Sequence, residues 1–209
     1  MSGAVWRPRK AARELSALDP RFRRLVEVLG PPTIAQRPST FTAIARSITY
    51  QQLAGAAANA IWTRVANLFD SEEIDPRAVL RKRDATFRKA GLSGPKTSYI
   101  KDLARHVIAE TLVPEDLPAL SDEEVIAALT QVKGIGPWSA QMHLMFSLKR
   151  PDVWPVLDLG VRKGWAKFTG EPEPNPRELD PLGDPYRPYR SILAWYMWRV
   201  HDLGDKWVG

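Results

Sequence analysis

Hydrophobic residues along this chain recur mostly at spacings of three and four, the periodicity of amphipathic helices. The clearest run lies within residues 39–69, with a possible break near 49–53. Its apolar positions are Phe41, Ile44, Ile48, Leu53, Ala57, Ile61, Val65 and Leu68. No long alternation of apolar and polar residues, the pattern of a half-buried strand, occurs anywhere in the chain. The pattern therefore predicts an all-α protein.

Residues that start and stop helices divide this pattern into elements. Asp19 is placed to cap a helix that has Pro20 at its first position. Asp75 predicts the start of a helix that Gly91 ends, and a further helix opens after Pro95.

The C-terminal half continues in the same way. Ser121 and Glu124 have the spacing of a capping box, and Pro137 suits the first turn of the following helix. Prolines break residues 175–190 into a predicted connector, and residues 190–203 form a final apolar helix.

Between two of these helices lies the stretch VKGIGPWSA, residues 132–140, which predicts a tight hairpin. Gly134 and Gly136 permit positive φ or close approach by another backbone, while Ile135 can plug the turn into a core. Backbone N–H groups at the start of a helix attract anions, of which phosphate is the expected one in a basic protein. The alternative is a helix–helix corner that binds nothing.

Charge and composition favour a polyanionic partner. The 209 residues include 30 Lys and Arg against 24 Asp and Glu, a net charge of +6 and a pI near 9.7. A hydrophobic content of 44% is enough for one large or two small cores. Nucleic acid is the partner that this balance suggests.

Other classes of function are excluded or disfavoured by what the sequence lacks. There is no cysteine, so disulfides, thiolate zinc sites and cysteine-bound iron–sulfur clusters are excluded. The three histidines show no paired metal spacing. No apolar run has the length that a bilayer requires, so we expect an intracellular protein, cytoplasmic or nucleoid-associated, with no membrane partner.

Four motifs in order carry a family resemblance. They are ITYQQLAGAAANAI, VKGIGPWSAQM, DVWPVLDLGVRKG and YRPYRSILAWYMW. With them the chain resembles the helix-hairpin-helix superfamily of DNA glycosylases, most closely the bacterial 3-methyladenine DNA glycosylase II group, from about Phe41 to Trp198. The resemblance implies two helical lobes with a DNA-binding cleft between them. We expect an N-terminal helix over 1–30 that packs on the C-terminal lobe, a middle lobe over 31–128, and a hairpin-containing C-terminal lobe over 129–209.

Asp158 is the expected catalytic residue. In the family that the chain resembles, the carboxylate at the position of Asp158 supports cleavage of the bond between a base and C1′ of deoxyribose. Local sequence alone indicates a helix N-cap, and the two roles are compatible because helix N–H groups favour the charged form. A fixed carboxylate stabilises positive charge on the sugar and can orient the attacking water.

Base flipping requires a wedge and a pocket. By resemblance, Leu53 fills the gap in the base stack, with Gln52 and Gln51 beside the DNA. Trp138 and Trp198 match positions that line the base pocket, and Tyr50 could join them. Their electron-rich rings would attract a cationic methylpurine.

The hairpin is the expected contact to the DNA backbone. Phosphate would meet Lys133, Gly134, Ile135 and Gly136, with Arg190 as a further basic residue. The resemblance also implies a monovalent cation, sodium or potassium, held by the backbone carbonyls of Thr130, Val132 and Gly134.

One position distinguishes the branches of the superfamily. Glycosylases that also cut the backbone carry a lysine nucleophile where this chain has Trp138. We therefore expect a monofunctional hydrolytic glycosylase, without AP lyase activity, that acts as a monomer on double-stranded DNA containing 3-methyladenine or 7-methylguanine and requires no cofactor. Many relatives have an acidic residue where this chain has Leu157, which leaves Asp158 without a second carboxylate beside it. The alternatives are a non-catalytic module that senses DNA damage, or a glycosylase for an oxidised base, uracil or a mismatch.

Overall fold

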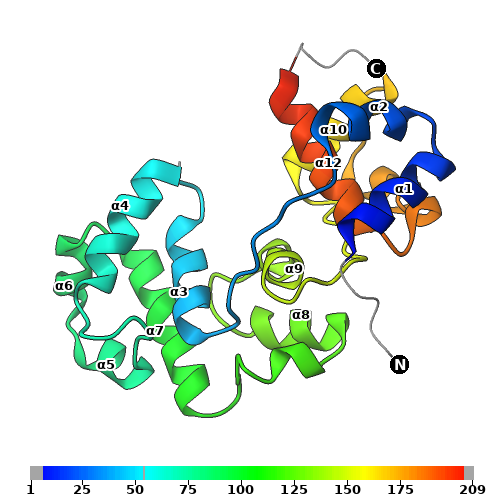
Figure 1. Ribbon diagram of the computed structural model, residues 1–209. Helices are drawn as coiled ribbons and strands as arrows, with labels where there is room; N and C mark the ends of the chain where they lie inside the picture. The colour runs from blue at the N-terminus through cyan, green and yellow to red at the C-terminus, as the bar shows by residue number, and fades with distance from the viewer. Residues whose placement is uncertain (1–6, 54, 205–209) are drawn as a thin grey trace. The chain divides into compact units, whose positions relative to one another are not determined.

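The computed structural model describes residues 7–53 and 55–204, and these residues form helices and loops with no strand (Figure 1). The all-α prediction is confirmed. The helices are α1 Pro8–Leu18, α2 Arg21–Leu29, α3 Phe41–Tyr50, α4 Gly55–Ala66, α5 Pro76–Arg81, α6 Asp84–Lys89, α7 Gly94–Ile108, α8 Asp122–Thr130, α9 Pro137–Phe146, α10 Leu159–Thr169, α11 Pro176–Leu182 and α12 Arg190–Leu203. Short 3₁₀ turns are η1 Leu117–Ala119 and η2 Asp184–Tyr186. Within the described residues, no helix is both long and apolar enough to cross a bilayer.

The chain divides into two compact units. Unit 1 combines residues 1–36 with residues 144–209, and unit 2 is the continuous stretch 37–143. Helices α1 and α2 therefore share a unit with the helices of the C-terminal part, α10 to α12. The hairpin falls in unit 2, where the Lys133 N–H donates to the Asp102 carboxylate and the Gln51 amide donates to the Gly134 carbonyl.

Unit 2 is built around α7. Helices α3, α5 and α6 pack on it, and its residues Leu103 and Ala104 are fully buried (Figure 1). Ile48 of α3 and Phe87 of α6 are buried in this unit as well. The 3.6-residue periodicity in the sequence thus corresponds to helix faces that meet in one core.

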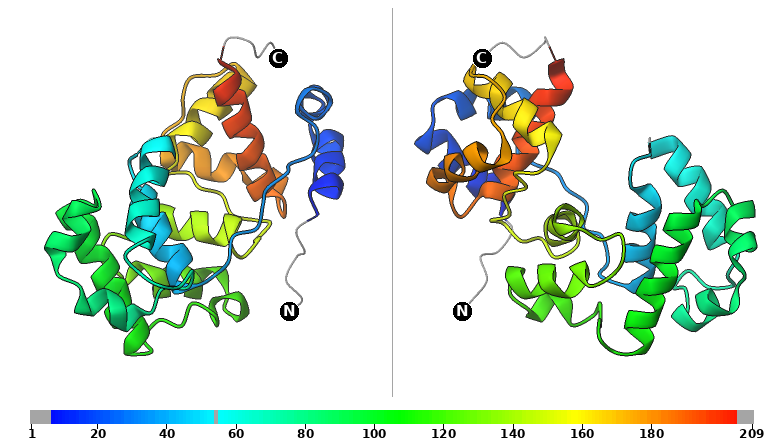
Figure 2. Two further views of the ribbon diagram at one scale, coloured as in Figure 1. Left: turned by 60° about the vertical axis from the view of Figure 1, so that its left-hand side comes forward. Right: turned by 180° about the vertical axis from the view of Figure 1, so that it is seen from behind.

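Unit 1 has α10 and α12 packed closely against each other (Figure 2). Phe22 of α2 is completely buried, and its ring centroid lies 4.8 Å from that of Phe168 and 5.7 Å from that of Tyr196. The buried Tyr186 hydroxyl donates to Asp19 Oδ2 at 3.0 Å, which satisfies both polar groups. An aromatic cluster from both ends of the sequence therefore forms the core.

Several local predictions are confirmed. Ser121 and Glu124 form the capping box at the start of α8, and Asp75 caps α5 through the Arg77 N–H. The expected break near 49–53 is real, because α3 ends at Tyr50 and α4 begins at Gly55.

Three local predictions were wrong. α2 begins at Arg21 with Pro20 as its N-cap, so Pro20 is not the first helical residue and Asp19 is not in the N-cap position. Residues 175–190 are not a plain connector, because Asn175 and Glu178 form a capping box that starts α11 despite the neighbouring prolines. The single helix expected between Asp75 and Gly91 is two helices, α5 and α6, separated where Lys82 adopts an extended ψ of 140°.

Candidate active site

The hairpin, residues 132–136, joins α8 to α9 in unit 2. Gly134 has φ +81°, and a Cβ there would lie 2.2 Å from the Tyr99 ring, so this position requires glycine. Ile135 is 7% exposed and plugs the turn into the core, as predicted. A Cβ on Gly136 would meet nothing within 4 Å, and its φ is not positive, so the fold does not itself require glycine there. The backbone at Gly136 is open to close approach from outside.

The N–H groups of the hairpin are not all available to a phosphate. The Lys133 N–H donates to Asp102 Oδ2 at 2.9 Å, and the Ile135 N–H donates to the Val132 carbonyl at 3.1 Å. Of the four residues expected to meet phosphate, Lys133 and Ile135 therefore already use their backbone N–H groups within the protein. The Lys133 side chain is 70% exposed, with its ammonium 3.9 Å from Asp102 Oδ1. Its charge, rather than its backbone, is what Lys133 presents to solvent.

The proposed cation ligands also have protein partners. The Gly134 carbonyl accepts from Gln51 Nε2 at 2.9 Å, and the Val132 carbonyl accepts from the Ile135 N–H. A carbonyl oxygen has two lone pairs, so these bonds do not decide whether Thr130, Val132 and Gly134 hold a cation. The cation stays a prediction.

The turn expected to enter the DNA, residues 50–53 and called here the wedge turn, follows α3. Leu53 is 40% exposed, so its side chain is accessible to DNA, as a wedge requires. Gln52 adopts φ +55°, a left-handed conformation that is uncommon for a residue with a side chain. Unusual backbone of this kind is concentrated at functional sites.

Two of the expected pocket residues lie in unit 2 with the wedge turn. Trp138, in the first turn of α9, is 40% exposed. Tyr50 donates through its hydroxyl to Asn59 Oδ1 at 3.0 Å, and the Arg46 guanidinium lies 4.7 Å from its ring centroid. Arg46 therefore already covers a face of the Tyr50 ring, which leaves less of it for a base.

A small pocket lies behind the hairpin in unit 2. Its lining residues are Ile44, Ser47, Ile48, Gln51, Leu129, Ile135, Ser139 and His143. Burial lowers the pKa of His143 to about 4, so its imidazole is neutral at pH 7. The His143 Nε2 lies 3.1 Å from Ser39 Oγ, which itself donates to the Pro114 carbonyl at 2.7 Å. Because Ser39 uses its proton there, the His143 Nε2–H is the donor to Ser39.

Asp158 is the N-cap of α10 in unit 1. Its backbone is extended, with φ −75° and ψ 119°, and its Oδ1 accepts from the Val161 N–H at 2.9 Å. The indole Nε1–H of Trp198 donates to the same oxygen, also at 2.9 Å. A helix N-terminus and a tryptophan thus hold the carboxylate in one orientation.

Two glycines on one face of α10 make this contact possible. A Cβ on Gly164 would lie 1.9 Å from the Met197 carbonyl oxygen, so α10 and α12 touch backbone to backbone. A Cβ on Gly160 would lie 3.0 Å from Trp198 Cδ1 and 3.1 Å from Asp158 Oδ1. Close packing at Gly164 brings Trp198 within reach of Asp158, and the absence of a side chain at Gly160 leaves room for their hydrogen bond.

Phe146, the last residue of α9, completes the arrangement in unit 1. Its ring stacks on Trp198 with centroids 5.8 Å apart and planes inclined by 21°. Phe146 could not be predicted from the sequence, because nothing in the local pattern relates it to a tryptophan on the last helix. Trp198 is thus oriented by Phe146 on its ring and by Asp158 on its N–H edge, which is more than the pocket wall that the resemblance implied.

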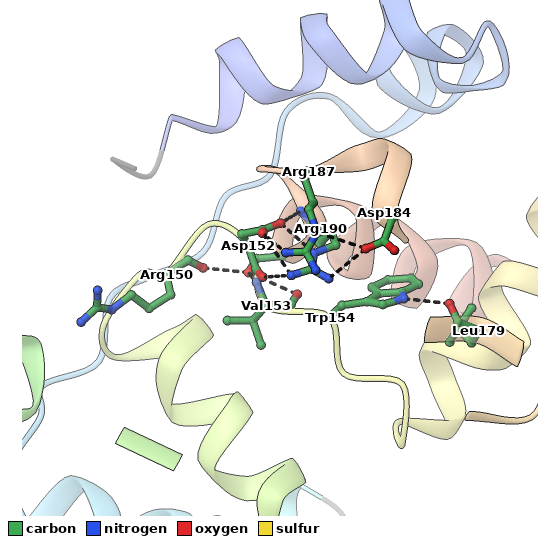
Figure 3. Close-up of polar contacts among 9 residues, drawn as sticks. Arg150, Asp152, Val153, Trp154, Leu179, Asp184, Arg187 and Arg190 are labelled. Carbon is green, nitrogen blue, oxygen red and sulfur yellow. Dashed lines mark hydrogen bonds and ion pairs between the residues drawn. The ribbon is translucent and has the colours of Figure 1, made fainter. Parts of the chain in front are cut away.

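The segment that leads to Asp158 is anchored on unit 1 (Figure 3). Ser191 Oγ donates to the Arg150 carbonyl at 2.7 Å and accepts from the Val153 N–H at 2.9 Å. Trp154 Nε1 donates to the Leu179 carbonyl at 3.0 Å. These bonds fix the chain shortly before the carboxylate.

Arg190 does not fit the expected phosphate contact. Its guanidinium donates to Asp152 Oδ1 at 2.8 Å, to Asp152 Oδ2 at 3.0 Å and to the Asp152 carbonyl at 2.9 Å (Figure 3). Only 11% of its side chain is exposed, and Asp184 lies nearby at 3.8 Å. A planar guanidinium bound to a carboxylate in this way anchors the segment before Asp158, so the phosphate contact is not retained. The sequence showed a basic residue but not its buried partner.

Helices that present a Gly-Ile-Gly hairpin in one unit and a carboxylate at a helix N-terminus in the other define a helix-hairpin-helix protein. The sequence profile of the HhH-GPD superfamily base excision DNA repair proteins matches residues 45–183. The chain belongs to this superfamily.

Individual relatives agree with this assignment. DNA-3-methyladenine glycosylase 1 of Schizosaccharomyces pombe is 34% identical over 203 residues, which cover 94% of this chain and 89% of that protein. A DNA-3-methyladenine glycosylase of Saccharomyces cerevisiae is 31% identical over 195 residues, and the match covers 77% of this chain and 66% of that protein.

Solved structures of related proteins have similar sequence identities and the same fold. The Schizosaccharomyces pombe 3-methyladenine DNA glycosylase in complex with abasic DNA has a TM-score of 0.82 at 31% identity and covers 96% of this chain and 100% of that one. A DNA-3-methyladenine glycosidase from Bacillus halodurans has a TM-score of 0.82 at 32% identity, covering 94% and 90%.

Proposed function

We propose that this protein is a DNA glycosylase that hydrolyses the N-glycosidic bond of alkylated purines, 3-methyladenine and 7-methylguanine, in double-stranded DNA. The observation that carries the proposal is the Asp158 carboxylate, held on Oδ1 by the Val161 and Trp198 N–H groups in a chain of this superfamily. The names of the relatives support the substrate class.

Asp158 supplies the charge that the reaction needs. Cleavage at C1′ builds positive charge on the deoxyribose, and a carboxylate beside it stabilises the transition state. The same group orients the attacking water and accepts its proton. Because Val161 and Trp198 hold the carboxylate before substrate arrives, little reorganisation is required when the charge develops.

The leaving group needs little help. Alkylation at N3 or N7 makes a purine cationic, so the departing base is neutral and no strong general acid is required. Trp198 in unit 1, and Trp138 and Tyr50 in unit 2, are the aromatic residues proposed to bind the flipped base, because aromatic ring faces favour a cation. Leu53 fills the gap that the base leaves, with Gln52 beside it, because flipping otherwise loses stacking worth a few kcal/mol.

The reaction is hydrolytic, without cleavage of the backbone. Trp138 stands where lyases of the superfamily carry their lysine nucleophile. Lys133, the lysine next to the hairpin glycines, has its ammonium 3.9 Å from Asp102, in an exposed position. Neither residue offers a desolvated amine for a Schiff base. The protein acts as a monomer and requires no cofactor, and a monovalent cation at the hairpin would serve only to attract a phosphate.

Base release from DNA treated with a methylating agent tests the proposal. The wild type, Asp158→Asn and the matched control Asp202→Asn are compared by chromatography of the freed bases. Asp202 is an exposed partner of Arg199 at the end of α12, so its variant should match the wild type. We expect the wild type and the control to release methylated purines, and Asp158→Asn to bind the DNA but release none.

Other results would redirect the assignment. Equal single-turnover release by Asp158→Asn would remove the carboxylate from the mechanism. No release by the wild type, with tight DNA binding, would favour a damage-sensing module or a glycosylase of another lesion. A protein–DNA adduct trapped by borohydride would overturn the monofunctional proposal.

A further inference from the structure

The wedge turn is connected to the hairpin by side chains that the catalytic proposal does not use. Lys96 of α7 donates through Nζ to the Thr49 carbonyl at 2.8 Å and to the Gln51 carbonyl at 2.5 Å. A cation there satisfies carbonyls at the C-terminal end of α3 and opposes the negative end of its dipole. Burial lowers the Lys96 pKa, but its bonds to two carbonyls favour the protonated form. The backbone of the turn is thereby fixed from below.

Gln51 makes the connection to the hairpin. Its Nε2 donates to the Gly134 carbonyl at 2.9 Å and lies 3.4 Å from Ser139 Oγ in the first turn of α9. The acceptor is in a fixed position, because Gly134 lies against the Tyr99 ring and has no space to shift toward it. One side chain therefore joins the turn that carries Leu53 to the loop whose Gly136 is open to a phosphate.

The backbone of the wedge turn needs such support. Gln52, directly after Gln51, has φ +55°, and a left-handed residue with a side chain is less stable by roughly 1 kcal/mol than an ordinary one. The Leu53 N–H reaches the Tyr50 carbonyl only at 3.4 Å, so the turn is weakly closed by its own backbone. The contacts of Lys96 and Gln51 hold it in this shape.

We propose that Gln51 is a positioning residue that couples the hairpin to the wedge, so that capture of a DNA phosphate at the hairpin sets the position of Leu53 in the base stack. The inference rests on the proposed function, since Leu53 is a wedge only if the protein flips bases. Gln51 acts through the backbone of the turn and through Leu53, not on the reacting atoms. Its amide is directed at the hairpin carbonyl rather than reserved for a base.

A double-mutant cycle on DNA affinity tests the coupling. Gln51→Met keeps the length of the side chain but removes the N–H donor, and it is measured in the wild-type and Leu53→Ala backgrounds. The probe is a duplex with a tetrahydrofuran abasic analogue opposite 2-aminopurine, whose fluorescence reports unstacking. Loss of one hydrogen bond predicts about fivefold weaker binding and a smaller fluorescence change. In the Leu53→Ala background Gln51→Met should have no further effect.

Two more variants make the result decisive. Gln51→Glu has nearly the same shape but places an acceptor against the Gly134 carbonyl, so it should weaken binding at least as much as Gln51→Met. Gln36→Met removes a comparable amide bond, from Gln36 Nε2 to the Ser147 carbonyl at 3.2 Å in unit 1, and should leave binding unchanged. Thermal unfolding of each variant separates loss of the fold from loss of coupling.

The outcomes judge the coupling separately from the glycosylase activity. Equal losses for Gln51→Met in both backgrounds, or no loss in either, would overturn the coupling even if the wild type releases methylated bases. A loss of affinity that Gln51→Met causes in the wild-type background but not in the Leu53→Ala background would support the coupling. This holds even if no base is released, because the cycle measures binding and not excision. Failure of the proposed function appears instead as DNA binding without base release.

Discussion

The bond from Trp198 to Asp158 offers the sharpest test of the geometry. Trp198→Phe removes the indole N–H that lies 2.9 Å from Oδ1 but keeps an aromatic ring to stack on Phe146. The carboxylate keeps its bond from the Val161 N–H. The substitution therefore removes the indole donor to Oδ1 and leaves the helix N–H donor in place.

The magnitude follows from the charge on the acceptor. A hydrogen bond to a charged group contributes roughly 1.5–3 kcal/mol, and each 1.4 kcal/mol corresponds to about tenfold in rate. Because Val161 still orients the carboxylate, we expect the lower end, about a tenfold slower single-turnover excision. Affinity for abasic duplex should stay within about twofold, since the lost bond does not reach the DNA backbone.

The assay is excision from a duplex with a single 7-methylguanine, at saturating protein. Trp195→Phe, on the same helix but packed on Tyr196 and Arg199, is the matched control and should excise at the wild-type rate. A Trp198→Phe rate equal to that of the control would refute a positioning role for the indole N–H. A loss confined to affinity would instead make Trp198 only a wall of the pocket.

Two further predictions concern stability. Gly164→Ala would place a Cβ 1.9 Å from the Met197 carbonyl oxygen, and only separation of α10 and α12 relieves this clash. We therefore expect the free energy of unfolding, measured by chemical denaturation, to fall by roughly 3 kcal/mol. Gly136→Ala, whose Cβ would meet nothing within 4 Å, is the control, and equal stability of the two variants would contradict the packing argument. The His143 pKa falls from 6.5 to about 4 on folding, so as pH drops through this window the unfolded chain takes up the proton first and roughly 3 kcal/mol of stability is lost. His143→Gln should show a smaller loss between pH 7 and pH 4, and an unchanged pH slope would exclude this histidine as its source.

Features set by neighbours in sequence could be predicted well. The capping box at Ser121 and the N-cap role of Asp158 depend on residues three positions apart, which the sequence displays directly. In residues 175–190 the prolines predict a connector, whereas Asn175 and Glu178, three positions apart like Ser121 and Glu124, form a capping box that starts a helix.

Features set by distant pairs could not be predicted. The sequence shows Arg190 as a basic residue, but only the fold brings Asp152 against it and removes it from the surface. Phe146 is invisible as a partner of Trp198 for the same reason. The sequence shows Gly164 as a glycine within a helix but does not show that α12 lies against it. The family resemblance supplied Asp158 and Trp198, whereas the supports around them required the structure.

The division of unit 1 between the two ends of the chain bears on how the protein is synthesised. Unit 2 is continuous, so it can fold as it leaves the ribosome, while Phe22 and Leu15 have left earlier without α10 and α12. At about 5–20 residues per second, those apolar side chains wait several seconds for their partners. During translation the N-terminal helices thus emerge long before the helices that they pack against, and the Asp158 carboxylate gains its indole partner only when α12 emerges.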